Sequence, residues 1–195
     1  WDKYPVEQVA TPEGYARNPE LVINFYNERR KQLLEVRPND GHLGLAELEA
    51  DFNVTVVTQN IDNLHERAGS RRIIHLHGEL TKVCSSRDPY NPHYIKELKP
   101  DEYEVKFGDK AGDGTQLRPF IVWFGEPVPE IETAVNYVEK ADIFVIIGTS
   151  MNVYPAAGLL NYVPREAEVY LIDPKPVDVH SMRRIHVIQK GASEG

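Results

Sequence analysis

An arginine on the apolar stripe of a predicted helix is the first residue of this sequence that could bind a ligand. The segment Pro19–Val36 has the signals of a helix start, with Asn18 as its N-cap, and its apolar residues recur at intervals of three and four. Arg29 falls on that stripe one turn after Tyr26, whereas Arg30 is expected to face solvent. A guanidinium stays charged, and its desolvation is costly without a partner. Arg29 therefore pairs with an internal carboxylate, waits for an anionic ligand, or extends its charged end into water.

Two histidines could supply a general base. His75 and His77 lie in the run I-I-H-L-H-G-E-L, and if Arg72–His77 is extended, both side chains face the same way. Imidazole has an unperturbed pKa of about 6.5, so either residue could accept a proton during catalysis. Each is also a plausible metal ligand, but the nearest acidic and sulfur residues lack ligand spacing, so the histidine pattern alone favours structural histidines whose hydrogen bonds are satisfied.

Small and hydrogen-bonding residues follow each predicted buried strand. The runs with β-branched, nearly continuous apolar character are Val54–Thr58, Ile143–Ile147, Val169–Ile172 and Ile185–Ile188. The residues that follow them are Gln59, Asn60 and Asp62, then Gly148, Thr149 and Ser150, then Asp173, and finally Gly191, Ala192 and Ser193. Ligands of open α/β sheets bind beyond the carboxyl ends of the strands, where such residues can hold phosphate and ribose. This placement favours a nucleotide pocket, although Gly148–Ser150 could simply cap the next helix.

Helical patterns alternate with these strands. They cover Pro19–Val36, His42–Asp51, Asp62–Ala68, Ile131–Lys140 and Tyr154–Tyr162. The alternation predicts an α/β fold with a Rossmann-like, doubly wound parallel sheet. The stretch Thr81–Thr115 breaks the rhythm and is interpreted as a small inserted module, so that residues 1–80 and 116–195 form the main domain.

The apolar run Leu117–Glu126, L-R-P-F-I-V-W-F-G-E, has two interpretations. It could be a further core strand. Alternatively, it could form the wall of a hydrophobic tunnel and an edge that an extended peptide joins by β-augmentation.

Composition restricts the classes of function. The 195 residues carry a net charge of −8, which argues against a broad basic face for nucleic acid. No apolar run approaches the length of about 20 residues that a membrane helix needs. The single cysteine, Cys84, can form neither an internal disulfide nor a Cys₄ zinc site, and it indicates a reducing compartment, so we expect a cytoplasmic protein.

Taken together, the motifs resemble those of the sirtuins, the NAD-dependent protein-lysine deacylases. The resemblance rests on T-Q-N-I-D-N-L-H-E-R-A-G at Thr58–Gly69, H-G-E-L at His77–Leu80, V-W-F-G-E at Val122–Glu126 and G-T-S at Gly148–Ser150. It extends from about Ala10 to Gly195. The spacing Tyr26-x-x-Arg29 resembles the subclass, widespread in bacteria, that removes succinyl and malonyl groups.

The resemblance implies roles for individual residues. His77 is expected to be the catalytic base, with Asn60 as a second catalytic residue. The residues expected to bind NAD are Gln59, Asn60, Ile61, Asp62, Gly148, Thr149, Ser150, Asp173 and Ala192. The residues expected to bind the acyl-lysine substrate are Tyr26, Arg29, Val122, Trp123, Phe124, Gly125 and Glu126. The implied partners are acylated-lysine proteins or peptides, and the implied products are nicotinamide, free lysine and O-acyl-ADP-ribose.

Two departures from the sirtuin pattern affect these expectations. The Gly-rich segment that wraps the NAD pyrophosphate does not occur, and the sequence is expected to begin just after it. The two C-x-x-C pairs of the zinc module are represented only by Cys84 in C-S-S-R, so no zinc is expected. Two alternatives therefore stay open beside the deacylase: a sirtuin-like module that binds ADP-ribose or an acyl-peptide without turnover, and a protein ADP-ribosyltransferase.

Overall fold

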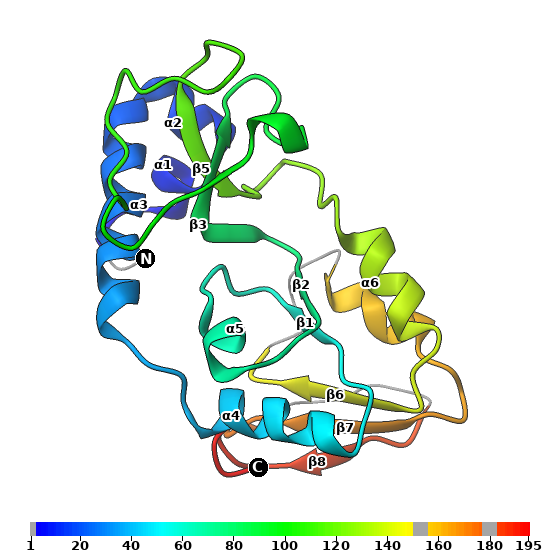
Figure 1. Cartoon of the computed structure of the whole chain (residues 1–195). Coiled ribbons are helices and arrows are strands. Elements are labelled where there is room, and N and C mark those ends of the chain that lie inside the picture. Colours follow the sequence, from blue (N-terminus) through cyan, green and yellow to red (C-terminus); the bar gives the residue numbers. More distant parts are fainter. Residues whose placement is uncertain (1–2, 150–155, 177–182) are drawn as a thin grey trace. The chain divides into compact units, whose positions relative to one another are not determined.

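The computed structural model describes residues 3–149, 156–176 and 183–195 of the chain (Figure 1). These residues form two compact units. Unit 1 consists of Trp1–Arg37, Asn60–Asn63 and His77–Pro129, and unit 2 consists of Pro38–Gln59, Leu64–Leu76 and Glu130–Gly195. Each unit is therefore built from separate stretches of sequence, and the chain passes several times from one to the other.

Unit 1 is an antiparallel sheet packed against helices of the N-terminal segment. Its strands lie in the order β4-β3-β5, and β3 pairs with β5. The elements are α1 (Val6–Val9), α2 (Pro12–Arg17), α3 (Pro19–Glu35), β3 (Gly78–Ser85), η2 (Pro92–Tyr94), β4 (Lys96–Glu97) and β5 (Leu117–Ile121). Ile23 of α3, Val83 of β3 and Val105 form one buried apolar cluster. Burial of these apolar side chains holds helix and sheet together.

Helix α3 begins as predicted but buries a different arginine. The Asn18 side chain accepts a hydrogen bond from the backbone N–H of Leu21, at 3.1 Å. Arg30 is buried, and its Nε donates to the carbonyl oxygen of Leu80 at 2.7 Å. The prediction that Arg30 faces solvent is wrong, because the main-chain carbonyl of β3 replaces the water that its guanidinium gives up. Arg29 is only half-buried.

The boundaries of unit 1 differ from those expected for an inserted module of residues 81–115. That segment shares unit 1 with Trp1–Arg37 and with residues 116–129. The reason is the pairing of β3 with β5, which closes residues 86–116 into a loop between two strands of one sheet. Because of this pairing and the packing of α3 on the sheet, unit 1 is larger than the module of residues 81–115 that the sequence pattern indicated.

Unit 2 contains the parallel strands. β1 (Val56–Thr58) pairs with β2 (Ile73–His75), and β6 (Ile143–Ile147) pairs with β7 (Glu168–Ile172), which pairs with β8 (His186–Ile188). The four predicted strands are confirmed as strands: Ile143–Ile147 has the predicted bounds, and the other three differ only in where they begin, by one or two residues. Val169 and Leu171 on one face of β7 are almost fully buried, whereas Ile143 and Val145 of β6 are 45% and 43% exposed, so β6 lacks the burial on both faces that its apolar run indicated.

The helices of unit 2 follow the predicted segments with shifted ends. They are α4 (Asp40–Glu47), η1 (Leu48–Ala50), α5 (Leu64–Ala68), α6 (Ile131–Val138) and η3 (Ala156–Tyr162). Asn39 caps α4 by accepting from the N–H of His42 at 3.0 Å, and the His42 ring accepts in return from the N–H of Asn39. The last predicted helix is a 3₁₀ helix where it is described, and residues 154 and 155 of that prediction lie outside the described residues.

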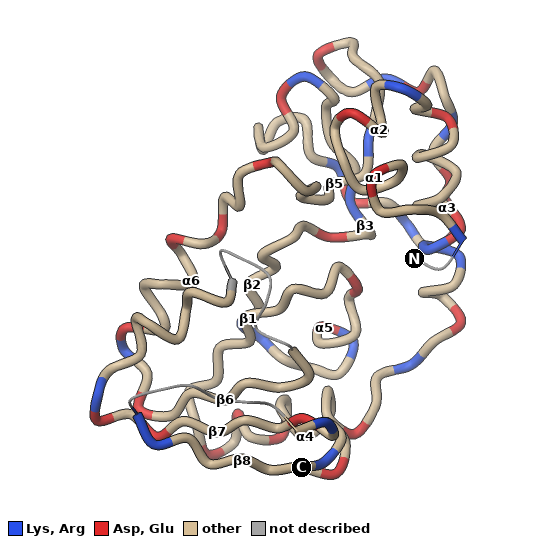
Figure 2. Tube along the Cα trace, turned by 180° about the vertical axis from the view of Figure 1, so that it is seen from behind, with Lys and Arg blue, Asp and Glu red and all other residues tan. Residues whose placement is uncertain are grey.

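Acidic and basic residues are interspersed along both units (Figure 2). Within the described part of the chain, no helix is both long and apolar enough to cross a membrane.

Candidate active site

His77 lies in a turn whose backbone is tightly fixed. The preceding strand β2 ends at His75, and β3 begins at Gly78, which has a φ of +86°. A Cβ atom at Gly78 would lie 2.1 Å from the carbonyl oxygen of Phe120, so only glycine fits here. The N–H of Val122 donates to the carbonyl oxygen of His77 at 2.9 Å. The expectation that Arg72–His77 is one extended run is wrong, because the chain turns after His75 to enter β3.

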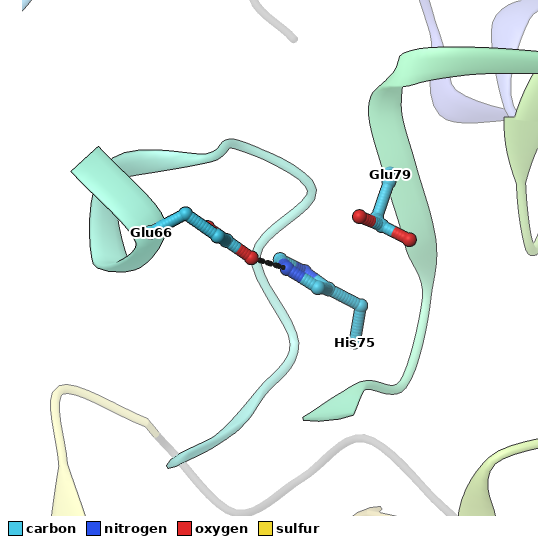
Figure 3. Close-up of side chains that lie close together, drawn as sticks. All are labelled: Glu66, His75 and Glu79. Carbon is cyan, nitrogen blue, oxygen red and sulfur yellow. Dashed lines mark hydrogen bonds and ion pairs between the residues drawn. The ribbon is translucent and has the colours of Figure 1, made fainter. Parts of the chain in front are cut away.

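His75 has a carboxylate partner. Its ring hydrogen-bonds to Glu66 of α5, within unit 2 (Figure 3). Burial opposes the charge on Glu66, but the hydrogen bond from His75 and the nearby histidine charges outweigh it and lower the pKa of Glu66. Glu79, also labelled in Figure 3, belongs to unit 1, where it accepts from Lys82 Nζ at 2.6 Å. The Glu66–His75 pair therefore ties α5 to β2.

The hydroxyl group of Tyr26 is enclosed in unit 1. Tyr26 is fully buried, and its hydroxyl donates to the carbonyl oxygen of Val9 at 3.0 Å. The same hydroxyl accepts from Trp123 Nε1 at 3.1 Å. Desolvation raises the pKa of Tyr26 to about 12, so the group remains a neutral donor at physiological pH. The one proton that Tyr26 can donate is thus used inside the protein.

Arg29 is held over an aromatic ring on the same helix. Its guanidinium carbon lies 4.4 Å from the centroid of the Phe25 ring, and Nη1 makes a long contact of 3.4 Å with Gln32. Among the described residues, no carboxylate forms an ion pair with Arg29. A half-buried cation on an aromatic face, without a carboxylate, is suited to receive an anionic group.

The segment predicted to bind substrate forms a tight turn after β5. The N–H of Glu126 donates to the carbonyl oxygen of Trp123 at 3.0 Å, and Gly125 has a φ of +89°. Trp123 is buried, whereas Phe124 is 58% exposed. The two aromatic side chains therefore differ in accessibility: Trp123 packs inside unit 1, and Phe124 is available to a ligand.

Both oxygens of Glu126 are bonded to Arg118, a residue that the sequence analysis did not single out. Nη1 and Nη2 of Arg118 each lie 2.9 Å from a carboxylate oxygen of Glu126. One of these oxygens also accepts from the N–H of Trp123 at 2.8 Å. Glu126, predicted to bind substrate, thus uses its carboxylate within the protein. An arginine inside the apolar run Leu117–Ile121 was the signal that could have revealed this pair.

The predicted NAD-binding motif is divided between the two units. Asn60–Asn63 belongs to unit 1, where the N–H of Leu80 donates to the carbonyl oxygen of Ile61 at 2.7 Å. Gln59 belongs to unit 2, and its Nε2 donates to Thr149 Oγ1 at 3.2 Å. This bond joins the carboxyl ends of β1 and β6, as expected if both strand ends contribute to one nucleotide site.

The other predicted nucleotide contacts also lie at strand ends of unit 2. Gly148 follows β6 with a φ of +61°, and a Cβ atom there would meet no other atom within 4 Å. Asp173 follows β7, and its Oδ1 accepts from the N–H of Lys175 at 2.8 Å. Ala192 lies beside the start of α4, since a Cβ atom at Gly41 would approach its carbonyl oxygen to 2.9 Å. Amide and hydroxyl side chains, with a glycine that leaves space beside the backbone, suit a nucleotide. Ser150 lies outside the described residues.

Hydrogen bonds around Ser85 and Asp113 join the two ends of the segment 86–116, which contains the end of the C-S-S-R motif. Cys84 is buried, and desolvation raises the pKa of its thiol to about 12, which disfavours the thiolate that a metal requires. Ser85 Oγ donates to Asp113 at 2.6 Å and accepts from the N–H groups of Arg87 and Asp88. Asp113 also accepts from the N–H and hydroxyl of Thr115, at 3.0 and 2.7 Å. These bonds join both ends of the 86–116 loop.

Comparison with known proteins decides the family. The sequence model of the Sir2 family matches residues 1–155. The chain belongs to the Sir2 family, the sirtuins. A relative from Bacteroides thetaiotaomicron, an NAD-dependent protein deacylase, is 86% identical over 195 residues, which are 100% of this chain and 83% of that protein.

Solved structures of Sir2 proteins share the fold. A complex of a variant Sir2 homologue with ADP-ribose superimposes with a TM-score of 0.86 at 34% identity, covering 100% of this chain and 78% of that one. A Sir2 homologue in complex with NAD gives a TM-score of 0.85 at 35% identity, covering 100% and 75%. The predicted family and the predicted Rossmann-like α/β fold class of this sirtuin are confirmed.

Proposed function

We propose that this sirtuin removes acyl groups from protein lysines in an NAD-dependent reaction and prefers succinyl and malonyl groups over acetyl. The enzyme class, NAD-dependent protein deacylase, and the cofactor NAD are confirmed by family membership and by the close relative. The preference for acidic acyl groups is supported by one observation: Arg29 is half-buried, lies on the Phe25 ring and makes no ion pair with the described residues. Acylated proteins are then its substrates, and a cytoplasmic location remains a prediction.

The catalytic role proposed for His77 follows from its place in the chain. When bound, NAD supplies an electrophilic ribose carbon with nicotinamide as the leaving group, and the ribose hydroxyl that receives the acyl group. His77 accepts the proton of that hydroxyl, which requires the neutral imidazole. Its backbone is fixed by Gly78 and by the bond from Val122, so the base is held before substrate arrives.

The other predicted residues divide into a nucleotide group and a substrate group. Gln59 and Thr149, already hydrogen-bonded to each other, hold the nucleotide with Gly148, Asp173 and Ala192 at the strand ends of unit 2. Asn60, Ile61 and Asp62, which follow Gln59 in the chain, complete the proposed nucleotide group. Residues 122–125 bind the substrate backbone, and the exposed ring of Phe124 lines the lysine stem.

Arg29 is proposed to bind the carboxylate at the end of the acyl group. A guanidinium can pair bidentately with a carboxylate, whereas an acetyl group offers no charge. Tyr26 is proposed as a second donor. Its hydroxyl would then donate its hydrogen bond to the acyl carboxylate and no longer to the carbonyl oxygen of Val9. It would still accept the bond from Trp123 Nε1.

Kinetics with matched peptides test the proposal. The enzyme should show a higher kcat/KM for a succinyl-lysine peptide than for the acetyl-lysine peptide of the same sequence. Arg29→Met should lower succinyl kcat/KM by about ten- to a hundred-fold, since a charged hydrogen bond contributes about 1.5–3 kcal/mol, and should change acetyl turnover much less. Lys31→Met, which removes an exposed charge from the same helix, is the matched control. Equal kcat/KM for both peptides in the unmodified enzyme would refute the preference.

A further inference from the structure

The guanidinium of Arg118, in unit 1, makes hydrogen bonds through all three of its nitrogen atoms. Arg118 is only 4% exposed. Its Nη1 and Nη2 bond to the two oxygens of Glu126, and Nη2 also donates to the carbonyl oxygen of Ile121 at 2.7 Å. Its guanidinium carbon lies 3.7 Å from the centroid of the Trp123 ring. One side chain therefore contacts the beginning, the middle and the end of the segment 121–126.

These contacts fix the segment in a way that β-sheet pairing does not. Strand β5 ends at Ile121, and the backbone beyond it is held by the bonds from the N–H groups of Val122 and Phe124 to the carbonyl oxygens of His77 and Ala10. Glu126 accepts from the N–H of Trp123 while it is itself held by Arg118. The planar fork of the arginine matches a carboxylate in two places at once, which an ammonium group cannot do.

We propose that Arg118 is a positioning residue that holds residues 122–125 in the conformation that binds the acyl-lysine peptide. The inference rests on the proposed function of that segment. Arg118 acts through Glu126 and Trp123, and neither its own side chain nor that of Glu126 touches substrate. The backbone beside the base His77 is fixed separately, by the positive φ of Gly78 and its close approach to the carbonyl oxygen of Phe120.

This role predicts a particular kinetic signature. Arg118→Lys keeps the positive charge but loses the fork, so the peptide-binding segment should loosen. We expect the KM for the acyl-lysine peptide to rise at least tenfold, while kcat at saturating peptide and the KM for NAD stay within about twofold. Glu126→Gln should give the same pattern. Because both changes break one interaction, the double variant should raise KM by clearly less than the product of the single effects.

Peptide binding and tryptophan fluorescence give readouts without turnover. The anisotropy of a fluorescein-labelled succinyl-lysine peptide, measured without NAD, should show the same loss of affinity. In a Trp1→Phe background Trp123 is the only tryptophan, and its emission should shift when Arg118 is changed. Arg87→Lys is the matched control, since Arg87 is an exposed arginine of the same unit that lies 3.6 Å from Asp113.

The outcomes separate this inference from the proposed function. A folded Arg118→Lys variant with unchanged peptide KM and affinity, or with KM for NAD raised equally, shows that Arg118 only stabilises the fold and overturns the inference. If Arg118→Lys does not fold, the same two comparisons are made with Glu126→Gln: the KM and affinity for the peptide, and the KM for NAD. If the unmodified enzyme turns over no acyl peptide, the proposed function fails, and the peptide anisotropy alone still tests the role of Arg118.

Discussion

Removing one buried oxygen from Tyr26 should destabilise unit 1 measurably. Tyr26→Phe leaves the ring in place but deletes the hydroxyl that bonds to Val9 and Trp123. The carbonyl oxygen of Val9 and the indole N–H of Trp123 then remain buried without these bonds. An unsatisfied buried group costs about 1–3 kcal/mol, so two such groups should lower the free energy of unfolding by about 2–6 kcal/mol.

Urea unfolding followed by far-ultraviolet circular dichroism measures this change. The midpoint should fall while the slope with denaturant stays the same. Tyr94→Phe is the control in the same unit, because the Tyr94 hydroxyl makes no hydrogen bond with the described residues, and its free energy of unfolding should change by no more than about 0.5 kcal/mol. A loss below about 0.5 kcal/mol for Tyr26→Phe would refute the reasoning, since the two bonds would then contribute nothing net.

Three further predictions concern the base, the loop and the metal. His77→Ala should lower turnover by about 10²–10⁴-fold without loss of peptide binding, whereas His75→Ala should lower stability and leave the chemistry intact; steady-state rates with urea unfolding check both. Hydrogen bonds from Ser85 and Thr115 lower the pKa of Asp113 from 3.8 to about 2, so its contribution to stability is present above pH 3.8 and is lost as the pH falls toward 2; Asp113→Asn should flatten that part of the acid unfolding curve. Elemental analysis should find no stoichiometric zinc, and a chelator should leave the circular dichroism unchanged; one tightly held zinc per chain would contradict this.

The parallel strands could be predicted from sequence because their apolar residues follow one another almost without interruption. The run I-F-V-I-I at Ile143–Ile147 has the predicted bounds in the structure. Strand β3 was missed because its half-buried polar residues Glu79, Thr81 and Lys82 break any regular alternation with buried ones and lie partly within a motif interpreted as a strand end. Sheet pairing over long sequence separations, such as β3 with β5, also leaves no local signal.

The periodicity of apolar residues could not predict which of Arg29 and Arg30 is buried. Both arginines complete a stripe with intervals of three and four, and hydrophobicity alone favours leaving either charge outside. Arg30 is the buried one because its Nε donates to the carbonyl oxygen of Leu80, a residue 50 positions away in sequence. The pair of Arg118 and Glu126 was missed for the same reason: a buried ion pair is recognised only when both partners are seen together.

The backbone N–H groups of residues 122–124 are all occupied within unit 1. They donate to the carbonyl oxygens of His77 and Ala10 and to the carboxylate of Glu126. A peptide strand that joins this stretch can therefore only give hydrogen bonds to its carbonyl oxygens, and cannot receive any from it. Residues 122–124 thus recognise the backbone of the incoming peptide by accepting hydrogen bonds from its N–H groups. Sequences with proline or N-methylated residues next to the modified lysine lack those donors, and the enzyme should discriminate against them whatever their side chains.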